Sequence, residues 1–217
     1  MQAQPSRSTP ATVTPLPRRA GTWRGVAASF RAAWNGVVET ALHQRNMRIH
    51  VVAGVLVGIL GSSIAFGVVE RLALLLSVFL VLSAEVANTA LEALVDLVTR
   101  ERRELARAAK DAGAGAVLVL AAASVVVLAV VVANARAALE APGVVLRPPV
   151  MAGLPLAVTT GVLLLPFQRR RAVDVALVAA GIVLLGVVAR WTEDAVFTAL
   201  AAVLFVVAVA VALRRRA

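Results

Sequence analysis

Six long apolar runs follow one another along the chain and cover most of its residues after position 50. They occupy approximately residues 50–69, 72–98, 113–134, 150–167, 173–189 and 195–213. A helix needs roughly 20 apolar residues to cross about 30 Å of hydrocarbon at 1.5 Å per residue, and the fourth and fifth runs are near the lower limit. Because a bilayer offers backbone polar groups no outside partner, this pattern predicts an all-α integral membrane protein with six transmembrane helices.

The segment before the first run, "TWRGVAASFRAAWNGVVETALHQRNMRIH", has a helical period with one apolar face. At 100° per residue, its large apolar side chains between Trp23 and Ala41 fall within an arc of about 120°, whereas Arg24 and Arg31 lie outside it. We predict an N-terminal amphipathic helix on the membrane surface, with Trp at headgroup depth. An amphipathic helix packed against protein is the alternative. Prolines among Ser and Thr predict that residues 1–21 form a disordered cytoplasmic tail.

Lys and Arg residues are distributed unevenly between the ends of the predicted spans. With a cytoplasmic N-terminus, seven precede the first span, five lie between the second and third, three lie between the fourth and fifth, and three follow the sixth. The other four are Arg71, Arg136, Arg147 and Arg190. Since basic residues concentrate on the cytoplasmic side of membrane proteins, this asymmetry predicts six spans with both termini cytoplasmic.

Composition agrees with a membrane protein and argues against a nucleic-acid-binding one. Hydrophobic residues make up 60% of the 217 residues and charged residues only 16%. The formal net charge of +10 could suggest nucleic acid, but the aromatic share is 4% and the arginines form short runs beside apolar spans. Topology explains the positive charge better, so no nucleic acid is predicted as a partner.

The second apolar run differs from the others because it carries a polar stripe within "SAEVANTALEALVDLV". On a helix, Glu85, Asn88, Glu92 and Asp96 share a face about 80° wide. If the C-terminal end of this span is cytoplasmic, Asp96 is nearest the interior water and Glu85 lies roughly 16 Å deeper. An unpaired acid in that setting is costly, so three carboxylates placed close together need cations.

The residues alone leave the source of these cations open. Arginines and Lys110 of the following loop could pair with Glu92 and Asp96, which would make the stripe structural. A proton or cation relay along the stripe is a second possibility. A divalent metal carried by a nucleotide is a third, since Mg²⁺ prefers one or two carboxylates together with phosphate oxygens and water.

Two linked motifs favour the third possibility. "EVANTALEALVD" is followed by "AKDAGAGAV", whose Lys is residue 110. Together they resemble the long pattern E-x-x-N-[ST]-A-[IL]-E-x-x-V-D and A-K-D of the bacterial integral-membrane diacylglycerol kinase and undecaprenol kinase family. Upstream, "SFRAAWNGVVETALHQRNMRIH" resembles the surface helix of that family and the entry to its first span. The resemblance covers residues 22 to about 134 and leaves 143–217 outside it.

The resemblance implies ATP-dependent phosphorylation of a membrane lipid hydroxyl, of undecaprenol or diacylglycerol, by direct phosphoryl transfer at the cytoplasmic surface. Glu85 matches the proposed general base of the family, and Glu92 matches a ligand of the Mg²⁺ on the nucleotide. The nucleotide-binding positions of the family are matched by Asn88, Asp96, Glu101, Lys110 and Asp111. An ammonium beside the phosphates suits such a site, because it offsets charge that builds up during transfer.

One metal position departs from the family pattern. The second metal-binding Glu of the family, in its "ERN" segment, is Gln44 here, within "HQRN". A neutral carbonyl oxygen is a weaker Mg²⁺ ligand than a carboxylate. The alternative function is therefore a non-enzymatic membrane protein, either a pseudokinase or an ion or proton carrier that uses the stripe of Glu85, Glu92 and Asp96.

The resemblance also implies an assembly and a location. The family is homotrimeric, with active sites between subunits at the cytoplasmic surface of the bacterial cell membrane. The first three spans would then form a lipid kinase domain over residues 22–134. Residues 143–217 are predicted to be an additional three-helix transmembrane region of unknown role.

Overall fold

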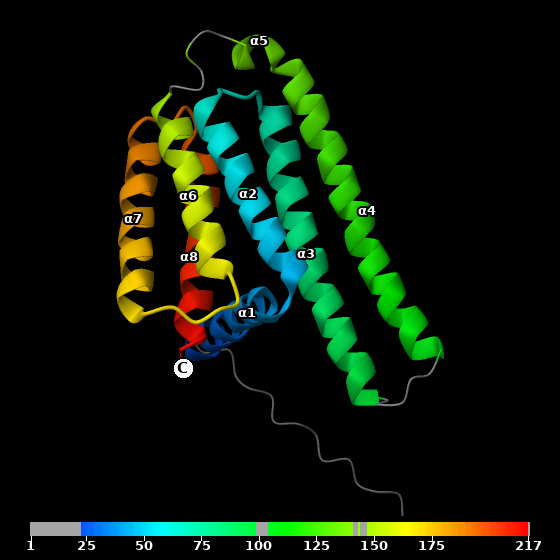
Figure 1. The fold of residues 1–217 in the computed structure, drawn as a ribbon. Coiled ribbons are helices and arrows are strands. Elements are labelled where there is room, and N and C mark those ends of the chain that lie inside the picture. The colour runs from blue at the N-terminus through cyan, green and yellow to red at the C-terminus, as the bar shows by residue number, and fades with distance from the viewer. Residues whose placement is uncertain (1–22, 99–103, 141–142, 144–146, 217) are drawn as a thin grey trace, which may run out of the picture. The chain divides into compact units, whose positions relative to one another are not determined.

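The computed structural model describes residues 23–98, 104–140, 143 and 147–216, and every regular element among them is a helix (Figure 1). The helices are α1 Trp23–His43, α2 Arg45–Ser63, α3 Val68–Val98, α4 Glu104–Asn134, α5 Arg136–Leu139, α6 Pro148–Leu164, α7 Arg171–Arg190 and α8 Ala195–Arg214. The chain divides into two compact units, residues 1–34 and 35–217. The second unit holds all helices from α2 onward and is the one described below.

Several of these helices could span a membrane. Five of the described helices have the length and composition to cross one, namely α2, α3, α4, α7 and α8. The apolar helix α6 is shorter, with 17 residues. The prediction of an all-α fold with membrane-capable helices is confirmed, while the count of six spans and the surface location of α1 stay predictions.

The first predicted span begins and ends earlier than the sequence pattern suggested. Gln44 has an extended backbone, with φ −90° and ψ 122°, which separates α1 from a helix that already starts at Arg45. At the other end Ile64 is extended, so that α2 ends at Ser63 and not near residue 69. Apolar residues therefore continue across a break in the helix, which a run of hydrophobicity cannot show.

The segment after α3 also differs from expectation. Lys110 and Asp111 were expected in a loop, but they lie on α4, which begins at Glu104. The sequence "ELARAAK" is rich in Ala, Leu, Glu, Arg and Lys, the strongest helix formers, and this propensity extends the helix beyond its apolar part. The start of the apolar run therefore does not mark the start of the helix.

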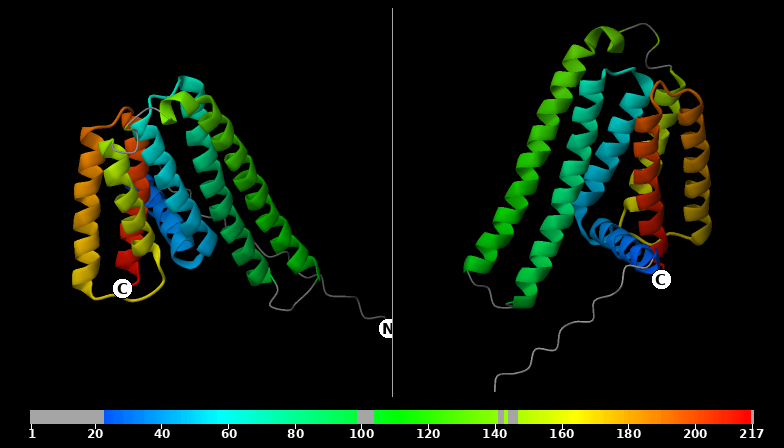
Figure 2. Two further views of the ribbon diagram at one scale, coloured as in Figure 1. Left: turned by 45° about the horizontal axis from the view of Figure 1, so that its top comes forward. Right: turned by 180° about the vertical axis from the view of Figure 1, so that it is seen from behind.

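α3 and α4 pack against each other as a long hairpin. Each has 31 residues, which corresponds to roughly 46 Å of helix and exceeds the thickness of about 30 Å of a hydrocarbon core. In Figure 1 the ends of α3 and α4 near residues 98 and 104 extend well past the N-terminal end of α2, and the rear view in Figure 2 agrees. This end of the hairpin holds the polar residues of the motif.

α2 is the helix that joins the two halves of the second unit. It packs against α3 on one side and against α6 and α8 on another. Glycines allow the close approach to α8: a Cβ atom at Gly58 would lie 2.9 Å from the carbonyl oxygen of Phe197, and one at Gly61 would collide with the Phe197 ring. The C-terminal helices are therefore packed directly on a helix of the N-terminal half of the chain.

Polar contacts secure the C-terminal end of α2 to the same helices. The Ser62 carbonyl accepts a hydrogen bond of 2.9 Å from the Glu193 backbone, and the Ser63 carbonyl accepts one of 2.7 Å from Arg147. Nearby, Arg71 of α3 and the buried Asp194 before α8 form an ion pair of 2.6 Å. The two hydrogen bonds satisfy carbonyl groups that the end of a helix leaves free.

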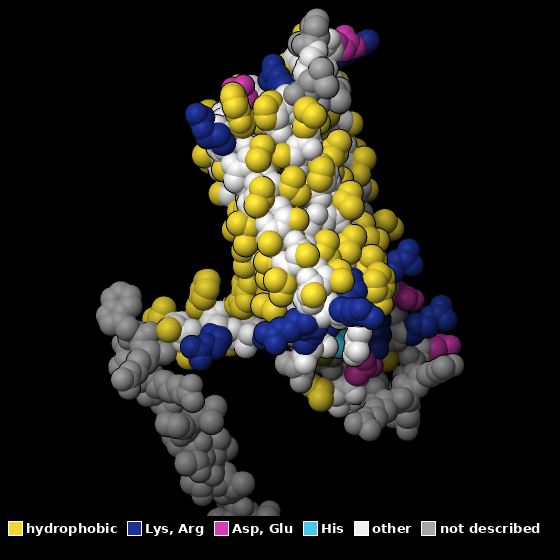
Figure 3. All heavy atoms as spheres, turned by 60° about the vertical axis from the view of Figure 1, so that its left-hand side comes forward, with side chains coloured by type: hydrophobic (Ala, Val, Ile, Leu, Met, Phe, Trp, Pro, Cys, Tyr) yellow, Lys and Arg dark blue, Asp and Glu magenta, His cyan; other side chains and the backbone are white. Residues whose placement is uncertain are grey.

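Figure 3 shows one face of the molecule in space-filling form, with a broad band of hydrophobic side chains bounded above and below by Lys and Arg. Many large apolar side chains are exposed along the helices, among them Val158, Ile182 and Val183. An exposed apolar band of this kind is typical of a surface that faces lipid.

Substitution of Gly61 tests the packing of α2 on α8. Gly61→Ala should lower the free energy of unfolding in detergent by roughly 1–3 kcal/mol, because the added methyl group must displace the ring of the buried Phe197. Gly186→Ala on α7 is the matched control, since its Cβ would meet no atom within 4 Å. Equal stability of the two variants would show that α2 and α8 do not approach this closely.

Candidate functional site

The polar stripe of α3 meets the N-terminal end of α2 at Glu92. The two carboxylate oxygens of Glu92 accept hydrogen bonds from different amides, one of 3.1 Å from Gln44 and one of 3.0 Å from Asn88. The extended backbone at Gln44 places this residue at the start of α2. The structure therefore brings together two predicted metal-site residues that are 48 positions apart in the sequence.

Glu85 lies deeper in the bundle than Glu92 and is almost fully buried, with 2% of its surface exposed. Its nearest ionisable neighbour is His50 of α2, whose Nε2 lies 3.5 Å from Oε1 of Glu85. The sequence offered no reason to connect His50 with the stripe, because the two residues belong to different spans. The only signal was its place in the "RNMRIH" segment that precedes the apolar run.

The shallow end of the stripe contacts α4. Lys110 Nζ lies 2.6 Å from Asp96 Oδ1, and one turn earlier Arg107 lies 3.5 Å from Asp111. Asp96 is well exposed, with 64% of its side-chain surface accessible, so this ion pair contributes little to stability. The ammonium of Lys110 is thus held at the stripe yet remains accessible from water.

A glycine sets the spacing between α3 and α4 at this level. A Cβ atom at Gly113 would collide with Oδ1 of Asn88 and lie 2.8 Å from Cδ2 of Leu91. A Cβ atom at Gly115, in the same motif, would meet nothing within 4 Å. Gly113 is therefore required for the close approach that positions Asn88, whereas Gly115 is not.

Glu101, the remaining predicted nucleotide-binding residue, lies outside the described residues. Of the other seven predicted site residues, six fall into two groups along α3. Gln44, Asn88 and Glu92 form a connected cluster, and Asp96, Lys110 and Asp111 lie at the end of the hairpin. Glu85 is apart from both groups, below the cluster and beside His50.

The cluster around Glu92 offers oxygen donors suited to a hard divalent cation. The residues that the structure describes include no group of three or more His, Cys, Asp and Glu side chains that could hold a metal by themselves. Gln44 and Asn88 present amide N–H groups to Glu92, while Oδ1 of Asn88 faces Gly113 and is buried without a hydrogen-bond partner in the described structure. Glu92 is thus the anionic oxygen ligand of this cluster, and one carboxylate fits Mg²⁺ that arrives bound to phosphates, which does not need a complete protein cage.

A small apolar cavity of about 160 Å³ lies between α2, α3 and α4. It is lined by His50 and by Val81, one turn before Glu85, and continues toward Ser77 and Ser124. The cavity reaches the His50 side of the buried carboxylate. Its apolar walls suit hydrocarbon better than a nucleotide.

Comparison with known proteins identifies the class to which this site belongs. Residues 31–132 match the model of the prokaryotic diacylglycerol kinase family. The matched region contains every predicted site residue and ends before α5. The chain belongs to the prokaryotic diacylglycerol kinase family, a family of lipid kinases, as its motifs had indicated.

Individual relatives agree with this assignment. The chain is 42% identical over 93 residues to the undecaprenol kinase of Bacillus subtilis, which is 43% of this chain and 76% of the relative. It is 42% identical over 109 residues to a diacylglycerol kinase of Synechocystis, covering 48% of this chain and 62% of the relative. A diacylglycerol kinase of Escherichia coli is 36% identical over 97 residues, 45% of this chain and 70% of the relative. No solved structure matches the chain significantly.

Substitution of Gly113 tests the geometry around Asn88. Gly113→Ala should slow phosphoryl transfer to lipid roughly 10- to 100-fold, because a shift of about 1 Å in a positioning group is enough for such a loss. Gly115→Ala, two residues away on the same helix, should stay near the unchanged rate. Initial rates at saturating ATP, with helical content as a folding control, would measure this. Equal rates for both variants would contradict the role of Gly113 as a spacer.

Proposed function

We propose that this chain is an ATP-dependent lipid kinase that phosphorylates a membrane lipid hydroxyl by direct phosphoryl transfer at the cytoplasmic surface. The observation that carries the proposal is the buried Glu85, which lies below a Gln44–Glu92–Asn88 cluster in the part of the chain that matches the family. A buried base beside a set of oxygen ligands is the arrangement that such a transfer needs.

In the proposed reaction Glu85 takes the proton of the lipid hydroxyl. The freed oxygen forms a bond with the γ-phosphorus of ATP, the bond from that phosphorus to the β–γ bridging oxygen breaks, and ADP leaves. His50 lies 3.5 Å from Glu85 and is the basic group beside this carboxylate. Burial excludes water from this step, which limits the hydrolysis of ATP.

The metal and nucleotide residues are assigned by their positions in the family motif. Glu92 and Gln44 would hold Mg²⁺. When bound, Mg²⁺ would offset negative charge on the phosphates. The residues that would contact the nucleotide are Asn88, Asp96, Lys110, Asp111 and Glu101. The contact between Lys110 and Asp96 supports this role for Lys110, because it holds the ammonium group at the stripe.

The acceptor is proposed to be undecaprenol or diacylglycerol, the lipids named in the relatives. Both present one hydroxyl group near the membrane interface on an apolar body. The cavity between α2, α3 and α4 supports an acceptor whose hydrocarbon enters from the bilayer and whose hydroxyl approaches Glu85. A panel containing both lipids, assayed with the same protein, would identify the substrate.

The proposed setting is the bacterial cell membrane. Six spans with both termini cytoplasmic place the end of the α3–α4 hairpin, with Lys110 and Asp96, on the side of the cell that contains ATP. The kinase domain would comprise residues 22–134. Residues 143–217 would form a separate, additional transmembrane region. A homotrimer is proposed because the family assembles in this way.

Replacement of the proposed base gives the most direct test. Glu85→Gln should abolish phosphorylation of both lipids while folded protein is retained, because the change removes the base and keeps the side-chain volume. Glu70→Gln, on the first turn of the same helix, is the matched control and should keep its activity. An active Glu85→Gln protein would eliminate the base assignment, and an inactive unsubstituted protein would favour the non-enzymatic alternative.

Gln44 allows a test of the metal site. Gln44→Glu should lower the Mg²⁺ concentration for half-maximal rate, because it adds an anionic ligand where an amide now lies 3.1 Å from Glu92. Without metal, two carboxylates at this distance repel each other, so the gain should be confined to conditions in which Mg²⁺ is bound. The measurement is a Mg²⁺ titration at constant ATP. An unchanged midpoint would show that residue 44 does not act on the metal.

A further inference from the structure

A second and larger hollow lies along a neighbouring face of α2. It is a groove of about 940 Å³ between α2 and α6, so one of its walls belongs to the region outside the family match. On α2 its lining residues Ile49, Val52 and Leu56 fall within an arc of about 60°, roughly 100–160° away from His50. These three residues are therefore turned away from the face that meets Glu85, and Ala53 lies at the border because it lines both the groove and the small cavity.

The walls of the groove are apolar and open to the surroundings. Ile49 and Leu56 of α2 and Leu154 and Val158 of α6 are each between 43% and 65% exposed. From Leu154 to Leu165 the groove follows α6 for roughly 16 Å, about half the thickness of a hydrocarbon core of about 30 Å. This length matches a chain that occupies one leaflet.

The end of the groove at the start of α2 is strongly positive. Arg45 is exposed and Arg48 is half-buried, and both line the groove. Among the residues that the structure describes, no carboxylate lies within ion-pair distance of either. Arg48 donates a long hydrogen bond of 3.5 Å to the carbonyl of Leu164. The two guanidinium groups therefore retain donors for an anion.

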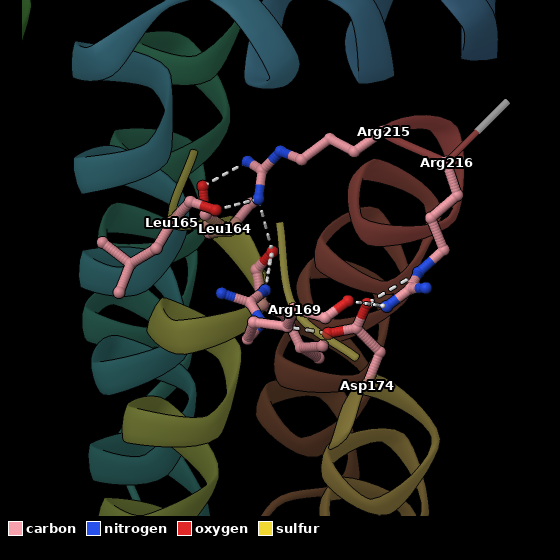
Figure 4. Close-up of polar contacts among 7 residues, drawn as sticks. Leu164, Leu165, Arg169, Asp174, Arg215 and Arg216 are labelled. Carbon is pink, nitrogen blue, oxygen red and sulfur yellow. Dashed lines mark hydrogen bonds and ion pairs between the residues drawn. The ribbon is translucent and has the colours of Figure 1, made fainter. Parts of the chain in front are cut away.

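Further arginines surround the same end of α6 (Figure 4). Arg215 donates to the carbonyl oxygens of Leu163, at 3.1 Å, and of Leu164 and Leu165. Burial, followed by the neighbouring cations Arg48 and Arg169, lowers the pKa of the Arg215 guanidinium. Asp174 is paired with Arg169 and Arg216 and so does not neutralise Arg45 or Arg48.

We propose that the α2–α6 groove binds one anionic phospholipid, with the headgroup phosphate at Arg45 and Arg48 and one acyl chain along the two helices. An apolar trough that ends in two cations, with no carboxylate partner among the described residues, matches a molecule with one anionic end and a hydrocarbon body. Arg is well suited to this contact because its planar group donates two parallel hydrogen bonds to a phosphate. The bound lipid would connect the kinase part of the chain to the additional helices.

Two independent variants test the site. Arg45→Gln combined with Arg48→Gln removes the headgroup contacts, and Gly161→Leu fills the groove. A Cβ atom at Gly161 would lie 3.6 Å from Val52, an ordinary contact, and Leu favours a helix more than Gly does. Controls are Arg136→Gln with Arg190→Gln, which removes two cations far from the groove, and Gly186→Leu, at a glycine with open space.

The experiment is native mass spectrometry of the full chain in detergent, titrated with phosphatidylglycerol or with phosphatidylcholine as the neutral probe. The unsubstituted chain should retain one phosphatidylglycerol per chain and bind phosphatidylcholine at least tenfold more weakly. Both groove variants should lose at least tenfold in affinity for phosphatidylglycerol, while the controls keep it. The readout is bound lipid, so it does not depend on kinase activity.

Three results would overturn the proposal. Equal retention of the two lipids would remove the role of the arginines, and unchanged binding in both groove variants would place the lipid elsewhere. A change in the number of chains per particle for Gly161→Leu, without an effect on lipid, would show that the groove is instead covered by a second copy of the chain.

Discussion

The close approach of α2 to α8 is the contact on which the arrangement of the helices depends. Gly58 and Gly61 leave α2 without side chains where Phe197 enters, and hydrogen bonds from Arg147 and Glu193 complete the end of the helix. In a membrane such packing has to rely on van der Waals contact and polar pairing, because lipid tails are as apolar as the side chains that they would replace. α2 is thereby fixed against the C-terminal helices while its other face serves α3.

The fixed position of α2 is what gives the site its geometry. The backbone turns out of α1 at an extended Gln44, and this turn brings the Gln44 amide to Glu92. Six residues further on, the same helix brings His50 to the buried Glu85. A rotation of α2 would move both contacts together, so the carboxylates of α3 depend on a helix that is itself held by the region outside the family match.

The sequence predicted those features that depend on a periodic pattern within a single helix. The 3.6-residue period placed Asn88 and Glu92 on one face of α3, and the structure shows them hydrogen bonded. The apolar runs predicted the membrane-capable helices. Contacts between distant elements, such as that of His50 with Glu85, were not predictable, since no local pattern records which helix packs on which. The break at Gln44 and the early start of α4 were missed because hydrophobicity does not mark helix ends where good helix formers or further apolar residues follow.

The packing of α2 on α8 must wait until α8 has been synthesised. Ala195, where α8 begins, follows Ser63 at the end of α2 by 132 residues. At about 5–20 residues per second, a ribosome needs on the order of 10 seconds to make that stretch. During this time α2 has α3 as a neighbour, but its glycine face and the carbonyl group of Ser62 still lack Phe197 and Glu193 as partners. The nascent chain therefore passes through a state in which α2 is made but the helix that packs on its glycines is not.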